Sequence, residues 1–249
     1  MKMLTFARRN AQEILRDKLN LLFGIGFPVV ILLLLSAIQA NIPQEAKQQM
    51  DLFRIEKLAP GITVFGLSFM TLFSATLIAK DRGTSLLQRL YTAPLTASDF
   101  ILGYTLPLLP ISLAQTAVCY LLALALGLTP SVNILLALLT ILPVAVFYIA
   151  LGLLCGSIFT DKQVGGICGA LLTNLSAWLS GIWFDLNLVG GAFKKAADLL
   201  PFVHAVDMER AALAGNTAGI LPHLYWVLGY MVLTLAAAVW AFLRQMKRQ

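Results

Sequence analysis

Charged residues are scarce in this sequence of 249 residues, since only 12% are Asp, Glu, Lys or Arg, while 59% are hydrophobic. About a quarter of the residues of a soluble protein are charged, and a soluble fold of this length could not bury so much apolar surface. Lipid is therefore the expected solvent. Uninterrupted apolar runs favour membrane-spanning helices over a barrel, whose strands alternate apolar and polar residues. The sequence predicts an all-α integral membrane protein.

Groups that convert energy or catalyse reactions are also missing. There is no Gly-x-x-x-x-Gly-Lys-[Ser/Thr] phosphate-binding loop, and the dipeptide Gly-Lys never occurs. No apolar run carries a pair of ionisable residues, which argues against a proton-coupled carrier, and no hydrolase-like Gly-x-Ser-Gly motif is present. We expect a chain that is not an enzyme and holds no cofactor, so energy for any transport must come from a partner.

Residues that bind metals or form disulfides have simpler explanations here. The three cysteines all fall inside apolar runs, where a buried thiol is commoner than a disulfide or metal ligand. His204, Asp207 and Glu209 lie close in the sequence, but helical spacing does not bring all three together. Helix caps and salt bridges are therefore favoured over a metal site.

Six apolar segments are long enough to cross a bilayer, which takes about 20 residues. They cover approximately residues 19–38, 58–79, 100–128, 132–159, 164–184 and 224–243. Residues 185–223 are too polar to cross and too apolar for an ordinary loop, so we expect short helices partly sunk into the outer leaflet. The whole chain, residues 1–249, is expected to form one transmembrane domain.

The distribution of Lys and Arg predicts the orientation. If the amino terminus is cytoplasmic, twelve of the 18 basic residues fall in the segments then placed inside, which are 1–18, 80–99, 160–163 and 244–249. This excess matches the positive-inside rule and places both termini in the cytoplasm of a multi-pass protein, typical of a bacterial cell membrane. Because the basic clusters lie beside the membrane, they suit anionic lipids, and we expect no nucleic-acid partner.

Residues 3–19 precede the first apolar run and are too polar to enter the membrane. Apolar residues such as Leu4 and Ile14 share one helical face, while Arg9 and Glu13 occupy the other. The pattern predicts an amphipathic helix on the cytoplasmic surface. It is either a simple anchor or a mechanical elbow that contacts a cytoplasmic partner.

The loop between the second and third spans is unusual because it has a capped, half-apolar helix of its own. Gly83 can end the second span, and Thr84 or Ser85 can cap a helix over residues 84–91, which Pro94 stops. This helix is suited to dock on a cytoplasmic partner, although a passive surface helix is the alternative. The candidate docking residues are Arg82, Gly83, Thr84, Leu86, Leu87, Arg89, Leu90, Tyr91 and Pro94.

Small residues recur every four positions in the fifth segment, and a milder small-polar face occurs in the second. Such stripes let helix backbones approach closely, while a polar group at membrane depth joins helices or faces a cavity. Helix packing and a pathway lining both remain open. The candidates are Ser68, Thr71, Gly169, Thr173, Asn174 and Ala177.

Together these features resemble the membrane subunit of ABC type-2 exporters, over essentially the whole chain. The resemblance rests on the amphipathic amino-terminal helix, the six spans, and residues 81–84 followed by leucines and Pro94-Leu95. It also rests on residues 99–103 and 200–210. One departure is that the loop helix lacks the family's acidic residue, and the gap between Gly83-Thr84 and Pro94 is about two residues longer than usual in the family.

The resemblance implies a mechanism and partners. A separate ABC ATPase subunit, which holds ATP and magnesium, would receive residues 84–91 as a coupling helix. A second permease subunit would pair with this one as a homodimer or heterodimer, and spans two and five would border the pathway. The expected function is ATP-driven export of an amphipathic drug, peptide or lipid-like molecule. The alternative is an immunity or sensing protein of the same architecture without net transport.

Overall fold

The computed structural model describes residues 2–43, 51–84 and 96–246, and every regular element within these ranges is a helix. Five helical stretches are long and apolar enough to cross a membrane. They are Lys18–Asn41 (α2, η1 and α3), Ile55–Gly83 (α5), Ser98–Ala125 (within α7 and α8), Asn133–Ile158 (α9) and Thr217–Gln245 (within α15). The prediction of an all-α, multi-pass membrane protein is therefore confirmed.

The expected span at residues 164–184 is not among these five. Its helical part consists of α10 (Asp161–Val164), the π-helix η3 (Gly165–Leu172) and α11 (Thr173–Trp178). Its first turn, α10, is charged and polar. The helix ends before Gly181, whose positive φ of 68° turns the chain. Because the polar start and early end shorten the apolar helix, the described residues support five long apolar helices rather than six.

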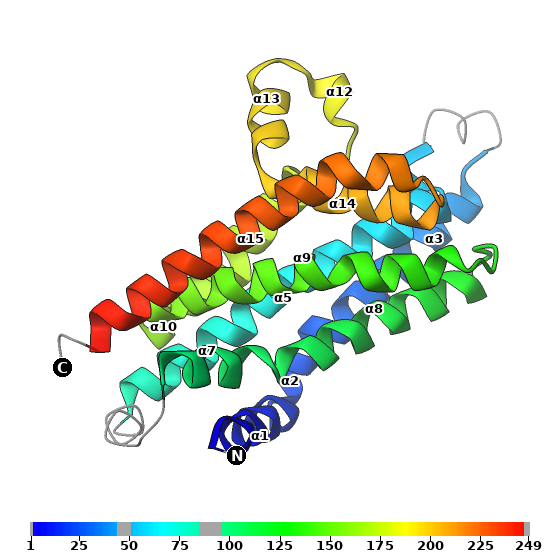
Figure 1. Ribbon diagram of the computed structural model, residues 1–249. Coiled ribbons are helices and arrows are strands. Elements are labelled where there is room, and N and C mark those ends of the chain that lie inside the picture. The colour runs from blue at the N-terminus through cyan, green and yellow to red at the C-terminus, as the bar shows by residue number, and fades with distance from the viewer. Residues whose placement is uncertain (1, 44–50, 85–95, 247–249) are drawn as a thin grey trace.

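The helix α5 lies at the centre of the bundle, where it packs against α9, α8 and the first span, while α15 packs on α9 (Figure 1). In its most apolar 18-residue stretch 89% of residues are buried, against 17% in the first span and 22% in α15. The outer helices therefore expose apolar side chains, which suits contact with lipid or with another subunit.

Two glycines one turn apart let α9 pack directly on the backbone of α5. A Cβ atom on Gly156 would lie 2.5 Å from the Ala75 carbonyl oxygen, and one on Gly152 would collide with the Thr71 carbonyl. The hydroxyls of Thr71 and Ser74 donate to α9 carbonyl oxygens at 3.0 and 2.8 Å. This is the small-xxx-small packing that membrane helices use in place of hydrophobic burial.

Shorter helices complete the two ends of the bundle. At one end α1 (Lys2–Arg16) contacts α7 (Ala97–Thr105), and Pro107 separates α7 from α8 (Leu108–Ala125). Thr96 and Asp99 form the expected capping box that opens α7. At the other end lie α12 (Leu186–Val189), α13 (Gly191–Leu199) and α14 (Pro201–Leu213), and α15 runs over Thr217–Met246.

Candidate functional site

A buried carboxylate joins three helices at the end of α5. Asp81 is 2% exposed. Arg9 of α1 donates to both of its oxygens, at 2.7 and 2.8 Å, and the hydroxyl of Tyr104 in α7 donates at 2.8 Å. Burial lowers the pKa of Arg9, but the hydrogen bond and charge of Asp81 outweigh it, so this pKa lies above its ordinary value. The bidentate pair thus ties α1 and α7 to α5.

The helix α1 packs against α7 partly through residues outside the predicted apolar face, although Ile14, which is on that face, is also buried. Phe6 lies edge-on to Tyr104 at 5.0 Å between ring centroids, and the Asn10 side chain donates to the Gly103 carbonyl at 3.0 Å. Leu4, on the predicted apolar face, is 62% exposed. Arg9 lies on the predicted polar face and is partly exposed, but its guanidinium also reaches Asp81, a partner 72 residues away.

Arg82, which the sequence assigns to docking, is bonded within the chain. Its Nη1 donates to the carbonyl oxygens of Gly156 and Phe159, at 2.7 and 3.2 Å, where α9 ends. A cation is favourable at that end of a helix dipole. Gly83 and Thr84 are exposed at the end of α5. The other docking candidates lie outside the described residues: Leu86, Leu87, Arg89, Leu90, Tyr91 and Pro94.

A groove of about 560 Å³ runs between the first span, α5 and the η3–α11 segment. Five aromatic rings and a wall of small residues dominate its lining, which contains no charged residue among those described. The rings of Phe65 and Phe69 lie 5.7 Å apart, and Phe65 meets Trp183 at 5.9 Å. The five rings are Phe23, Phe27, Phe65, Phe69 and Trp183.

The predicted pathway candidates divide between this groove and the core. Four of them line the groove, namely Gly169, Thr173, Asn174 and Ala177. Ser68 and Thr71 instead face the protein interior, where Ser68 donates to the Phe65 carbonyl at 2.6 Å and Thr71 binds α9.

Sequence reasoning missed the aromatic side of the groove, because a phenylalanine in a membrane span is unremarkable by itself. The signal was the spacing. Phe23 and Phe27 are one turn apart on the first span, and Phe65 and Phe69 repeat that spacing on α5. Two such pairs place four rings on facing helices.

His204, Asp207 and Glu209, which lie close in the sequence, point in three directions in the structure. His204 meets His223, with their Nδ1 atoms 3.0 Å apart, and Asp207 binds Arg210 at 3.3 Å. Glu209 turns the other way, into the core. The described residues contain no group of three or more His, Cys, Asp or Glu side chains that could hold a metal.

Glu209 is a fully buried carboxyl group that sequence reasoning took for a cap or ion pair. It accepts hydrogen bonds from Thr140 of α9 at 2.7 Å and from Tyr120 of α8 at 3.0 Å. Burial raises its pKa to about 8, although both hydrogen bonds act in the opposite direction. The carboxyl group therefore joins α14 to two spans.

Replacing Glu209→Gln should change how stability depends on pH. Because burial raises the carboxyl pKa from 4.5 to about 8, the folded state binds more protons than the unfolded state between these values. The wild-type free energy of unfolding then falls as pH rises through this window. At pH 9 the neutral amide should be more stable by about 2–5 kcal/mol, with little difference at pH 5. Thermal unfolding in detergent from pH 5 to 9 measures this, and parallel profiles would contradict it.

The five long apolar helices define a multi-pass membrane protein, and a groove without charged lining residues among those described lies between them. A family model described as ABC-2 type transporter matches residues 1–214. The chain therefore belongs to the ABC-2 type transporter family, as a permease of an ABC-2 transport system. Permease domains of this family usually work with an ATPase partner. A search of curated proteins finds no match.

Proposed function

We propose that this chain is the membrane subunit of an ATP-driven exporter, and that the groove is its half of the pathway. One observation carries the proposal: α5 bears both the Asp81–Arg82 cluster and two rings of the groove, Phe65 and Phe69. Twelve residues of helix, about 18 Å, separate Phe69 from Asp81. A rigid α5 can therefore transmit a displacement from its end to the groove.

A separate ABC ATPase would cause the displacement at this end of α5. Its docking site would be the coupling helix at residues 84–91, directly after α5, with ATP and magnesium held by the ATPase. A push on Gly83 would move α5 together with α1 and α7, through Asp81, and with α9, through Arg82. This chain would perform no catalysis and hold no cofactor.

The orientation with both termini in the cytoplasm requires an even number of crossings, so the η3–α11 segment should be the sixth. Contacts at its two ends support this. Residue Phe159, just before α10, binds Arg82 at the end of α5, whereas Gly181 binds Arg210, which also donates to Lys57 at the start of α5. The segment thus runs the length of α5, and its 18 helical residues span about 27 Å.

A second permease subunit, identical or not, would complete the pathway. The first span borders the groove and is the least buried of the five apolar helices, so a facing copy could close the open side. The aromatic rings would stack on an apolar substrate, and Asn174 would offer it hydrogen bonds. This lining suits an amphipathic drug, peptide or lipid-like molecule.

Docking by residues 84–91 is tested by Leu87→Asp. A buried charge in a helix–groove contact is costly, so the variant should retain less than a tenth of the ATPase that co-purifies with the wild type. Leu188→Asp is the matched control, because Leu188 is 87% exposed on α12 at the opposite end, and it should retain ATPase fully. Equal retention by both variants would contradict docking. ATP-dependent efflux from vesicles carrying both proteins then separates export from sensing without transport.

A further inference from the structure

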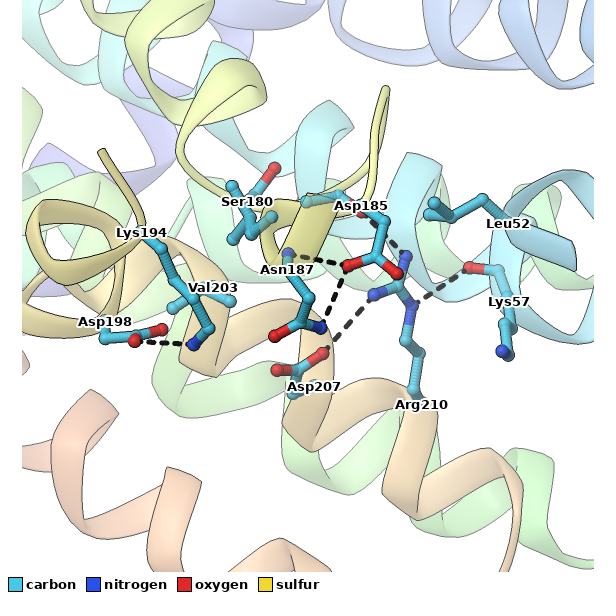
Figure 2. Close-up of a pocket in the computed structure, with 12 residues that line it drawn as sticks. Leu52, Lys57, Ser180, Asp185, Asn187, Lys194, Asp198, Val203, Asp207 and Arg210 are labelled. Carbon is cyan, nitrogen blue, oxygen red and sulfur yellow. Dashed lines mark hydrogen bonds and ion pairs between the residues drawn. The ribbon is translucent and has the colours of Figure 1, made fainter. Parts of the chain in front are cut away.

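The end of the molecule opposite Asp81 contains a polar pocket of about 360 Å³ (Figure 2). The start of α5, the turn after α11, and α12, α13 and α14 all contribute to it. Its lining has equal numbers of basic and acidic side chains, so its formal charge is zero. They are Lys57, Lys194 and Arg210, and Asp185, Asp198 and Asp207.

Arg210 makes three hydrogen bonds within this pocket. It donates to Asp207 at 3.3 Å, to the Gly181 carbonyl at 3.1 Å and to the Lys57 carbonyl at 3.4 Å. The Asp185 carboxylate lies next to the same guanidinium in Figure 2. Opposite charges are thus placed a few ångströms apart around one cavity.

The ion pairs of the pocket can exchange partners at little cost. Lys194 and Asp198 form a pair at 2.7 Å on α13, and both side chains are well exposed, as is that of Asp207. Water screens such pairs, so they contribute little to stability. In a ligand with one anionic and one cationic group, the anionic group could take the place of a pocket carboxylate beside a basic side chain. The cationic group could then pair with that carboxylate, so that every charge stays paired.

The surroundings of the pocket match the head-group layer of a membrane. Leu188 on α12 and Leu199 on α13 are large exposed apolar side chains. Tyr225 and Trp226 on α15 are exposed aromatic residues, which concentrate at membrane–water interfaces. The hydroxyl of Tyr230 on α15 donates to the Leu199 carbonyl at 2.6 Å, so these helices form one continuous surface.

We infer that this pocket binds a zwitterionic head group, in which a phosphate or carboxylate is joined by a short linker to an ammonium group. The anionic group would contact Lys194 and Arg210, and the ammonium group would contact Asp198 and Asp207. A ligand of one charge sign would meet three like charges. The inference concerns binding alone and does not depend on export.

Lipid binding to the purified full-length chain, measured by native mass spectrometry, tests the inference. Short-chain phosphatidylethanolamine should bind about tenfold more tightly than phosphatidylglycerol with the same acyl chains. Lys194→Gln should weaken phosphatidylethanolamine about tenfold, the usual effect of losing one charged hydrogen bond. Lys195→Gln, the exposed neighbour that does not line the pocket, should leave binding unchanged.

Two further arms identify what is recognised. Asp207→Asn gives the pocket a net positive charge, so it should raise phosphatidylglycerol binding to at least the level of phosphatidylethanolamine. Soluble phosphoethanolamine should displace the bound lipid if the head group itself is the ligand; failure to displace it would assign binding to the acyl chains and overturn the inference. Equal binding of the two lipids by the wild type, or equal effects of Lys194→Gln and Lys195→Gln, would also overturn it.

Discussion

Gly156→Leu should lower the thermal unfolding midpoint of the detergent-purified chain by about 10 °C or prevent its folding. A side chain at Gly156 meets the backbone of Ala75, which cannot rotate away, so α9 must move off α5. Overpacking of about 2 kcal/mol would add to the loss of the Thr71 and Ser74 hydrogen bonds, about 1 kcal/mol each. A loss of about 4 kcal/mol is a large part of ordinary folding stability.

Gly229→Leu on α15 is the matched control for this prediction. A Cβ at Gly229 would meet no described atom within 4 Å beyond its own local helix backbone, and leucine is a better helix former than glycine. The control should therefore unfold within a few degrees of the wild type. Equal midpoints for the two variants would show that α5 and α9 are not packed through Gly152 and Gly156.

Asp81→Asn should uncouple ATP hydrolysis from transport. The asparagine keeps the shape of the side chain but removes the charge that holds Arg9, so α1 and α7 lose their common attachment to α5. Since Arg9 is partly exposed, the cost in stability should stay near 2 kcal/mol. In vesicles with the ATPase, substrate transport should fall at least tenfold while ATP hydrolysis continues.

Two companion variants make the Asp81 result specific. Arg8→Gln removes an exposed charge next to Arg9 and should leave transport intact. Arg9→Gln should reproduce the uncoupling, and the double variant Arg9→Gln with Asp81→Asn should add little further loss, because the two residues act as a pair. Additive losses, or uncoupling by Arg8→Gln, would argue against a transmitting role for the pair.

The sequence could predict the lipid environment and the helical fold because both follow from composition and the length of apolar runs. Those properties are local. The segment 164–184 resembles a full-length apolar span by hydropathy, which registers its leucines but not its π-helix, its polar first turn or the turn at Gly181. Its passage along α5 emerges only from contacts at its two ends.

A small residue makes a tight helix contact only if another helix backbone faces it. A repeat of small residues in the sequence does not show which helix, if any, lies opposite. Small residues of the fifth segment, Gly165 and Gly169 among them, were expected to pack or to line a cavity, but a Cβ at Gly165 would meet nothing within 4 Å outside its own helix, and one at Gly169 would meet only the flexible Leu72 side chain. The tight pair, Gly152 and Gly156, has the same spacing on α9. Sequence spacing thus identified a kind of surface but could not assign its partner.

The buried charges were beyond sequence reasoning for a related reason. Asp81 follows Lys80 at the end of an apolar run, which is the ordinary position for a solvated residue. Its burial depends on Arg9 and Tyr104, which are distant in the sequence. Glu209 likewise depends on Tyr120 and Thr140. Only tertiary structure brings such partners together.

Accessibility of Asn174→Cys to a membrane-impermeant maleimide tests the proposed pathway most directly. Asn174 is exposed in the groove, and the three native cysteines are buried, so the label should report this position. In cells that produce the chain with its ATPase, labelling from outside should change at least tenfold between energised and ATP-depleted conditions. Leu139→Cys, exposed on α9 away from the groove, should show no such change. Equal labelling of Asn174→Cys in both conditions would contradict a pathway through the groove.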